Sequence, residues 1–453
     1  MMRSMWSGVE GLKTHQLEMD VIGNNIANVN STSYKSQATG FSDIFYQTIK
    51  QGNGAGDNRA TTNASQVGFG SRVASIMTNV TKQGSAMLTD NVLDLMITGD
   101  SFFCVKKDYT STEMNFSRDG ALTIDADGYL VTQNSGLYVM GQNGAGNIEG
   151  ITQLDRLKVI DRNTQRQGVD AKGNPITYMV DTMPAKATSA AYFKGNIDKE
   201  DEALEEERDL LLEVFGNDGK TYTLKFKLTD GGDLEDNTYN MSLSQITDAA
   251  GNKLAFDNQI NIDLVYDKHN GKLTSINGNN TQKYNLTLTG AAGPLVGPLD
   301  IDFSTTSNFA SSSFSHVSSI DVHKGDLKGQ NMGYTTGELV GISFGTDGSI
   351  FGRYSNGQTQ KKGQMVVAEF YNAMGLEKIG DGLYKASPNS GNPMYMDITK
   401  DGGYMTSGVL EGSNVDLAKE FTDMITTQRG FQANSKVITT SDEMLQLLKS
   451  LKR

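Results

Sequence analysis

The sequence predicts an α+β protein in which long N- and C-terminal helices form a coiled-coil-like stalk, with two nested, mainly antiparallel β domains between them. Apolar residues recur at helical spacing in the last forty residues and again in the first thirty. The 453 residues include 50 glycines, 6 prolines and only 8% aromatic residues, a composition typical of short strands joined by tight turns. A chain of this length has room for about three domains.

The C-terminal stretch 413–453 predicts one long helix with an apolar seam. Its residues step by four and three in alternation, the roughly 3.5-residue repeat of a helix that packs along another helix. The first part of the seam comprises Leu417, Phe421, Met424, Gln428, Phe431, Ser435 and Ile438. After a slip of one residue, the stripe continues as Val437, Ser441, Met444, Leu448 and Leu451. Ser413 and Asp416 have the form of a capping box, which predicts where the helix begins.

The N-terminal residues carry a matching seam, which predicts that the first and last helices lie together. This seam comprises Met2, Met5, Val9, Leu12, Gln16, Met19, Gly23 and Ile26. The pair could be an ordinary coiled-coil hairpin that stabilises a single monomer. However, several large apolar residues fall outside the seam, and a two-helix stalk cannot cover them, so we expect further copies of the stalk to do so. These residues are Trp6, Ile22, Val29, Ile425, Val437 and Leu447.

Four parts are predicted along the chain. Residues 1–30 and 413–453 form a terminal helical domain, and residues 31–70 form a connecting segment. Residues 71–146 and 331–412 form a discontinuous inner β domain, and residues 147–330 form an outer β domain inserted into it. Strand-like runs that flank Asp127-Gly128 predict a hairpin in the inner domain, and runs that flank Asp218-Gly219 predict one in the outer domain.

The charge of the chain argues against two classes of partner. The formal net charge is −13, which disfavours binding to nucleic acid or to an anionic membrane. The acidic excess lies in the middle of the chain, where residues 155–328 include 26 acidic and 18 basic residues. No apolar run is long enough to span a bilayer, and the N-terminus lacks a basic-then-apolar signal peptide. We therefore expect a protein that packs by its ends and is exported, if at all, without cleavage of a leader.

Signals of enzyme chemistry are weak. Cys104 is the single cysteine of the sequence, which excludes an internal disulfide, and its apolar surroundings predict a buried thiol. The four histidines lack metal-ligand spacing, apart from the loose pair His316 and His323. No P-loop and no motif of nucleophilic catalysis occurs in the sequence. We expect no catalytic site, no cofactor and no metal.

Several motifs resemble those of the axial proteins of the bacterial flagellum, the rod, hook and hook-associated proteins. Residues 23–35 read GNNIANVNSTSYK, which is similar to the N-terminal signature of that family except that Ser33 replaces the usual glycine. Residues 92–105, VLDLMITGDSFFCV, and residues 120–131 resemble two further segments of the family. At the far end, residues 408–416, GVLEGSNVD, and residues 427–447 resemble its C-terminal signature.

The resemblance implies a structural subunit of the flagellar hook, since the length, the long insert and the wording of residues 408–416 favour hook over rod. It implies copies stacked into a curved tubular polymer that acts as a universal joint between rod and filament. The implied partners are other copies, the distal rod protein, the hook cap, the hook–filament junction proteins and the type III export apparatus, and the implied location is extracellular. The expected self-assembly residues are Met5, Val9, Leu12, Met19, Ile26, Asn28, Asn30, Leu417, Phe421, Met424, Phe431, Ile438, Met444 and Leu448.

Other interpretations remain open at this point. Within the same family, the chain could be a distal rod subunit. Outside it, the pattern fits an extracellular adhesin-like or surface-layer β protein with a helical stalk, and less well a carbohydrate-active β enzyme. Deletion of the gene separates hook from rod, because loss of a rod subunit removes the whole external structure and loss of the hook leaves the rod in place.

Overall fold

The computed structural model describes residues 2–451 except residues 53, 55–60, 109–110, 112, 145, 147–153, 170–174, 232–236, 258 and 311–315. The chain forms two compact units. The terminal unit comprises Met1–Asp161, Ile342–Gly352 and Gln360–Arg453, and the inserted unit comprises Arg162–Gly341 and Arg353–Thr359. The four-part division expected from the sequence is finer than this and stays a prediction.

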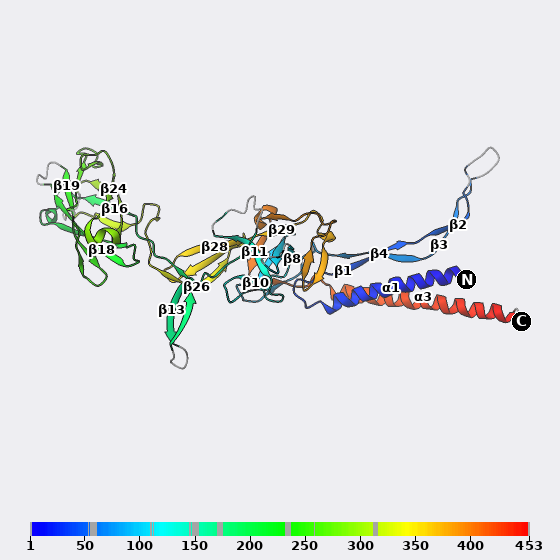
Figure 1. Cartoon of the computed structure of the whole chain (residues 1–453). Helices are drawn as coiled ribbons and strands as arrows, with labels where there is room; N and C mark the ends of the chain where they lie inside the picture. Colours follow the sequence, from blue (N-terminus) through cyan, green and yellow to red (C-terminus); the bar gives the residue numbers. More distant parts are fainter. Residues whose placement is uncertain are drawn as a thin grey trace. The chain divides into compact units, whose positions relative to one another are not determined.

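Two long helices of the terminal unit confirm the predicted helical ends of the chain. Helix α1 spans Met2–Ala27 and helix α3 spans Leu417–Leu451. They lie side by side with the N- and C-termini at the same end, so they are antiparallel (Figure 1). None of the described helices is both long enough and apolar enough to cross a membrane. The pairing itself is observed, whereas the coiled-coil stalk stays a prediction.

Helix α3 begins later than the expected capping box places it. Its N-cap is Asp416, whose carboxylate accepts hydrogen bonds from the backbone N–H groups of Ala418 at 3.0 Å and Lys419 at 3.3 Å. The Ser413 hydroxyl accepts instead from the N–H of Val415 at 3.3 Å. The prediction of a cap at Ser413 was therefore wrong by about one turn, because residues 413–415 remain outside the helix.

The terminal unit also contains a β-rich part. Its two-stranded ribbons are formed by β1 with β4 and by β2 with β3, and its other strands build a larger sheet with two short pairs beside it. The strands are β1 Gln37–Asp43, β2 Tyr46–Lys50, β3 Ser65–Gly68, β4 Ser71–Thr78, β5 Ala86–Leu88, β6 Leu95–Thr98, β7 Phe102–Lys106, β8 Asn115–Ser117, β9 Leu122–Ile124, β10 Leu130–Thr132, β11 Tyr138–Asn143, β12 Asp155–Arg156, β28 Thr359–Met365, β29 Val367–Glu369, β30 Glu377–Gly380, β31 Leu383–Lys385, β32 Met394–Met396, β33 Tyr404–Ser407 and β34 Val409–Glu411.

Strand β7 organises the core of this part because both of its faces are buried. Phe103 and Val105 belong to one apolar cluster, and Phe102 and Cys104 belong to another, as the alternation of side chains along a strand requires. The Cys104 thiol is free and buried, as expected, and burial raises its pKa far above the ordinary range. The predicted hairpin around Asp127-Gly128 is confirmed by the antiparallel pairing of β9 with β10.

The inserted unit contains two sheets that share one apolar core, and a separate two-stranded pair of β13 with β14. The larger sheet runs in the order β17-β18-β19-β21-β22, and a four-stranded sheet runs in the order β23-β24-β16-β25. The remaining elements of the chain are β13 Thr164–Val169, β14 Pro175–Val180, β15 Thr182–Met183, β16 Ala190–Ile197, η1 Glu202–Leu204, β17 Arg208–Phe215, β18 Thr221–Asp230, β19 Thr238–Asp248, β20 Lys253–Leu254, β21 Asn261–Tyr266, β22 Leu273–Ile276, β23 Lys283–Leu286, η2 Gly290–Ala292, α2 Gly293–Val296, β24 Leu299–Asn308, β25 Asp321–Lys324, β26 Gly337–Phe344, β27 Ser349–Tyr354, η3 Ala373–Gly375 and η4 Ile398–Asp401.

The β architecture agrees with the predicted fold class at the level of strand direction. Among the described strand pairs with a defined register, β16 with β24 is parallel and the others are antiparallel. The hairpin expected around Asp218-Gly219 is confirmed by β17 and β18, which pair from Phe215 opposite Thr221. Alternate residues of β18 are buried, which is the period-two pattern of a strand with one face on the core.

Candidate self-assembly surface

Helices α1 and α3 approach each other closely at glycines that lie against side chains of the other helix, including the seam residue Ile438. A Cβ added at Gly8 would lie 3.2 Å from the Ile438 side chain, and one at Gly11 would lie 2.5 Å from the Asn434 amide. On the opposite helix, a Cβ at Gly430 would lie 2.7 Å from the His15 ring. Since side chains of one helix fill the space that a β-carbon would need on the other, these glycines permit the close approach.

Polar side chains complete the contact between the two helices. The Asn25 amide donates a hydrogen bond of 3.1 Å to the Glu420 carboxylate, and the hydroxyls of Ser4 and Ser441 lie 3.4 Å apart. Glu420, Ser441 and Thr427 are the buried residues of α3. The beginning of α1 thus contacts the C-terminal part of α3, and the end of α1 contacts the beginning of α3, which confirms the antiparallel arrangement.

The residues expected at the seam of α3 fall into two groups. Met424, Phe431 and Ile438 are half-buried, whereas Leu417, Phe421, Met444 and Leu448 are exposed. In the isolated chain these four do not form a buried seam with α1, because the glycine and asparagine contacts rotate a different face of α3 toward α1. Their expected role in self-assembly stays a prediction.

The expected residues of the N-terminal stretch are less exposed. Half-buried positions are held by Met5, Val9, Leu12, Met19, Ile26 and Asn28, whereas Asn30 is exposed. Part of this burial comes from the β1–β4 ribbon, which packs on α1: the Thr14 and Ser71 hydroxyls lie 3.4 Å apart, and the His15 and Phe41 rings lie 6.4 Å apart. Strand β1 of the connecting segment 31–70 therefore contacts α1, together with β4, which begins at Ser71.

Large apolar side chains remain uncovered along both helices. Phe421 is 50% exposed at one end of the pair, and Leu447 and Trp6, toward the other end, are 63% and 60% exposed. The β2–β3 ribbon adds Tyr46 and Ile49, which are also exposed. Exposed apolar side chains that gather along one element mark candidate sites of protein association.

The signature loop that follows α1 borders a polar cavity of about 640 Å³. Asn28 and Asn30, two of the expected self-assembly residues, lie in its wall together with Tyr34 and Lys378. The Lys378 ammonium lies 3.9 Å from the centre of the Tyr34 ring, a cation–π contact. Burial lowers the pKa of Lys378 below its ordinary value. The end of α1, the signature loop and strand β30 therefore all contribute to the wall of this cavity.

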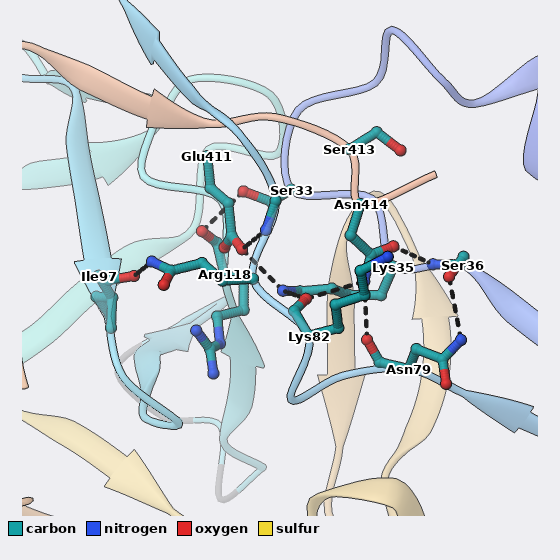
Figure 2. Close-up of polar contacts among 12 residues, drawn as sticks. Ser33, Lys35, Ser36, Asn79, Lys82, Ile97, Arg118, Glu411, Ser413 and Asn414 are labelled. Carbon is teal, nitrogen blue, oxygen red and sulfur yellow. Dashed lines mark hydrogen bonds and ion pairs between the residues drawn. The ribbon is translucent and has the colours of Figure 1, made fainter. Parts of the chain in front are cut away.

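A buried ion pair lies where the two ends of the chain meet the β-rich part of the terminal unit (Figure 2). The Lys35 ammonium donates to Glu411 Oε1 at 2.8 Å and to the carbonyl oxygen of Lys82 at 2.8 Å. Both side chains of the ion pair are 1% exposed. The same carboxylate oxygen accepts from the N–H of Gly84 at 2.8 Å. Burial lowers the pKa of Lys35, and the Glu411 charge opposes that effect.

Asn414 extends this junction through three backbone contacts (Figure 2). Its side-chain oxygen accepts from the N–H of Ser36 at 2.7 Å, and its amide donates to the carbonyl oxygens of Asn79 and Lys82 at 2.9 Å each. Three chain segments far apart in sequence are thereby held together. The sequence interpretation missed Asn25, Lys35, Glu411 and Asn414 as contact residues, although they lie in the motifs that carry the resemblance.

Ser33 adopts the left-handed conformation that explains why glycine is usual at this position. Its φ is 54°, a region that costs a non-glycine residue about 1–2 kcal/mol. The Ser33 N–H donates to the carbonyl oxygen of Glu411 at 2.8 Å, and its hydroxyl donates to the carbonyl oxygen of Arg118 at 2.8 Å. The serine thus offsets the conformational cost with a buried hydrogen bond that glycine cannot make.

Replacing Ser33 separates these two effects. Ser33→Ala keeps the strain and removes the buried hydrogen bond, so we expect the free energy of unfolding to fall by about 1–3 kcal/mol. Ser33→Gly also loses the hydrogen bond but relieves the strain, so its loss should be smaller by about 1 kcal/mol. Urea denaturation of the full-length variants measures both. Equal losses for alanine and glycine would show that the left-handed conformation carries no cost here.

The buried Glu420 gives the helix pair a pH dependence. Burial raises the pKa of its carboxyl above the ordinary value, and the hydrogen bond from Asn25 opposes the rise. The packed helices therefore bind a proton more readily than separated ones. This stabilising contribution is complete below the ordinary pKa and is lost as the pH rises through the raised pKa of the folded state.

We expect protection of the first turns of α3, measured by amide exchange corrected for intrinsic rates, to decrease as the pH rises from the ordinary pKa of a glutamate through the raised pKa of Glu420. Glu420→Gln keeps an acceptor for Asn25 but cannot ionise, so its protection should stay level over this range. Glu443→Gln, at an exposed position of the same helix, should retain the original profile. A Glu420→Gln profile identical to that of the unmodified chain would assign the pH dependence to another group.

Within the described parts of the chain, no group of three or more His, Cys, Asp and Glu side chains is placed to hold a metal ion. The strongest polar constellation, around Lys35 and Glu411, is buried and joins segments of the backbone. Its geometry fits a structural junction.

Three flagellar family models match separate parts of the chain. The model described as flagella basal body rod protein matches residues 5–35, the flagellar hook protein FlgE/F/G D1 domain matches residues 96–178, and the flagellar basal body rod FlgEFG protein C-terminal model matches residues 406–451. Together with paired terminal helices and a β-rich middle, these matches define a structural protein of the flagellar axial structure.

Relatives that align over the whole length of the chain narrow the assignment from axial proteins in general to one family. The flagellar hook protein FlgE of Borreliella burgdorferi is 33% identical over 476 residues, and that of Treponema pallidum is 32% identical over 505 residues, each alignment covering 100% of both chains. The flagellar basal-body rod protein FlgG of Bacillus subtilis, also matched over 100% of both chains, is 27% identical. This chain belongs to the flagellar hook protein family.

Membership of this family decides between the interpretations left open above. The chain is a structural subunit of the flagellar hook and not an enzyme, and it assembles with copies of itself within the axial structure of the flagellum. A solved flagellar hook protein of Helicobacter pylori, FlgE2, aligns with 72% of this chain and 100% of its own at a TM-score of 0.45 and 15% identity, and the assignment does not rest on it.

Proposed function

We propose that copies of this chain polymerise into a curved tube that acts as a universal joint and transmits torque from the rod to the filament. The observation that carries the proposal is the uncovered apolar surface of α1 and α3 in the single chain, including Trp6 and Phe421. An antiparallel pair held by glycines and polar residues leaves that surface to other copies. Repeated at each subunit, such contacts form a closed helical wall.

The proposed polymer is layered. The terminal helices form a dense inner tube, the β-rich part of the terminal unit forms the middle of the wall, and the acidic inserted unit faces solvent. The expected self-assembly residues of both helices, with Asn28 and Asn30 of the signature loop, belong to the inner contacts. Weak polar contacts between outer surfaces would slide as the tube bends, whereas the inner contacts would persist.

Further partners follow from the resemblance to the axial proteins. They are the distal rod protein at one end, the hook cap and the hook–filament junction proteins at the other, and the type III apparatus that exports the chain without cleaving a signal peptide. The assembled protein is then extracellular. We propose no nucleic-acid or membrane partner, in keeping with the net charge of −13.

Electron microscopy of the concentrated full-length chain tests the proposal. The expected result is curved tubes of uniform diameter, and a strain without the gene should keep its rod but lack hook and filament. Straight tubes, or loss of the whole external structure from the strain, would instead assign the chain to the rod. A chain that stays monomeric at high concentration would contradict self-assembly.

A further inference from the structure

Four contacts along the helix pair obey a single antiparallel register. Wherever α1 advances by seven, four or ten residues from one contact to the next, α3 goes back by the same number of residues. Steps of seven and four are those of a heptad seam, so these contacts mark the line along which the two helices face each other. The pairs are Ser4 with Ser441, Gly11 with Asn434, His15 with Gly430 and Asn25 with Glu420.

This line of contact consists of small and polar residues. The buried residues of α3 are Glu420, Thr427 and Ser441. The Asn434 side chain occupies the space beside Gly11, and its amide nitrogen would lie only 2.5 Å from a β-carbon at that glycine. Contacts of this kind bury little apolar surface, but they accept few alternative partners, so they specify a pairing more than they stabilise it.

Pairing in another heptad register is disfavoured. A slip of one heptad in one direction would place Glu18 opposite Glu420, so that two carboxylates would face each other. A slip in the other direction would place Glu420 beyond Ala27, the last residue of α1, and would take this acceptor away from the Asn25 amide. The junction of the chain ends holds only the base of the pair, and the same register continues to the end that carries both termini (Figure 1).

We propose that Gly11 and Asn434 are specificity-determining residues for self-assembly, because they select the pairing of α1 with α3 that leaves large apolar side chains outside. Phe421 and Leu447 are 50% and 63% exposed in this pairing. If the apolar stripes of the two helices paired with each other, one chain would cover its own apolar surface and offer less of it to other copies. This role rests on the proposed assembly through the uncovered faces.

A disulfide reporter measures the register in the dilute full-length chain. The substitutions Ser4→Cys and Ser441→Cys provide it, since the two hydroxyl oxygens lie 3.4 Å apart and the natural Cys104 is buried. Gly11→Leu should slow formation of this intramolecular disulfide about tenfold, because the new side chain meets Asn434. Without the reporter cysteines, it should also reduce the polymer yield. Asn434→Ala removes the three atoms nearest to the added β-carbon, so combining it with Gly11→Leu should restore both the disulfide and the polymer.

Gly23→Leu is the matched control, because a β-carbon at this exposed glycine of α1 would meet nothing within 4 Å beyond its own helix backbone. It should leave the rate of disulfide formation unchanged. Absence of the disulfide in the unmodified background, an unchanged rate in Gly11→Leu, or failure of Asn434→Ala to restore that rate would each overturn the inference.

Assembly of the same variants separates this inference from the proposed function. Normal yield of tubes from Gly11→Leu, despite the slowed disulfide, would overturn the role in assembly and leave the proposed function intact. A chain that forms the reporter disulfide but never polymerises would contradict the proposed function instead, and with it the role that rests on that function.

Discussion

Lys35→Met is expected to lower the free energy of unfolding by about 3–5 kcal/mol, because it leaves the Glu411 carboxylate buried and unpaired. The methionine preserves the length and apolar stem of the side chain, so the change is mainly one of charge. Loss of this junction also releases the carbonyl of Lys82 from its ammonium donor. Polymer yield should therefore fall together with stability, as measured by sedimentation and urea denaturation.

Two further variants isolate the cause. Glu411→Gln in the Lys35→Met background removes the unpaired charge and keeps an acceptor for the N–H of Gly84, so stability should be partly restored. Lys385→Met breaks an exposed pair with Glu113 and should change the free energy by about 0.5 kcal/mol or less. A Lys35→Met loss no greater than that of Lys385→Met would show that the buried pair contributes little.

Phe421→Ala should block assembly while leaving the monomer almost unchanged. The side chain is half exposed in the single chain, so its truncation removes little that stabilises the monomer. If neighbouring copies bury the ring, truncation costs about 3 kcal/mol per subunit, which raises the critical concentration roughly 100-fold. Phe431, the largest apolar residue of the central turns, is half-buried already and would mix the two effects.

The measurements are polymer yield by sedimentation and thermal unfolding of the dilute monomer. Lys419→Ala, an exposed change two residues away, should affect neither strongly. Normal polymerisation of Phe421→Ala would remove this face of α3 from the proposed inner contacts. A large loss of monomer stability would mean that the residue belongs to a core within one chain.

Local pattern was sufficient to predict much of this protein. The apolar period predicted both terminal helices, and turn residues flanked by strand-like runs predicted the hairpins at Asp127-Gly128 and Asp218-Gly219. These features depend on residues close together in the chain, where backbone geometry relates spacing directly to structure. The motifs at both ends of the chain were also sufficient to identify the protein family.

Contacts between distant segments were decided by the tertiary structure. Period alone named Leu417 and Phe421 as seam residues, but glycines at 8, 11 and 430 let polar side chains bring a different face of α3 against α1. The helix register depends on which shapes fit closely, and spacing along one helix does not contain that information.

The junction of the chain ends shows the same limit most clearly. Lys35 and Glu411 are 376 positions apart, and neither sequence position alone indicates a buried charge. In the sequence, Ser33 is a small departure from the usual glycine. Its positive φ and its hydrogen bond to the carbonyl oxygen of Arg118 became visible only in the structure. The sequence by itself determined the helices, the hairpins and the family. Only the tertiary structure decided which polar groups form buried contacts with one another, because burial of a charge depends on every segment that surrounds it.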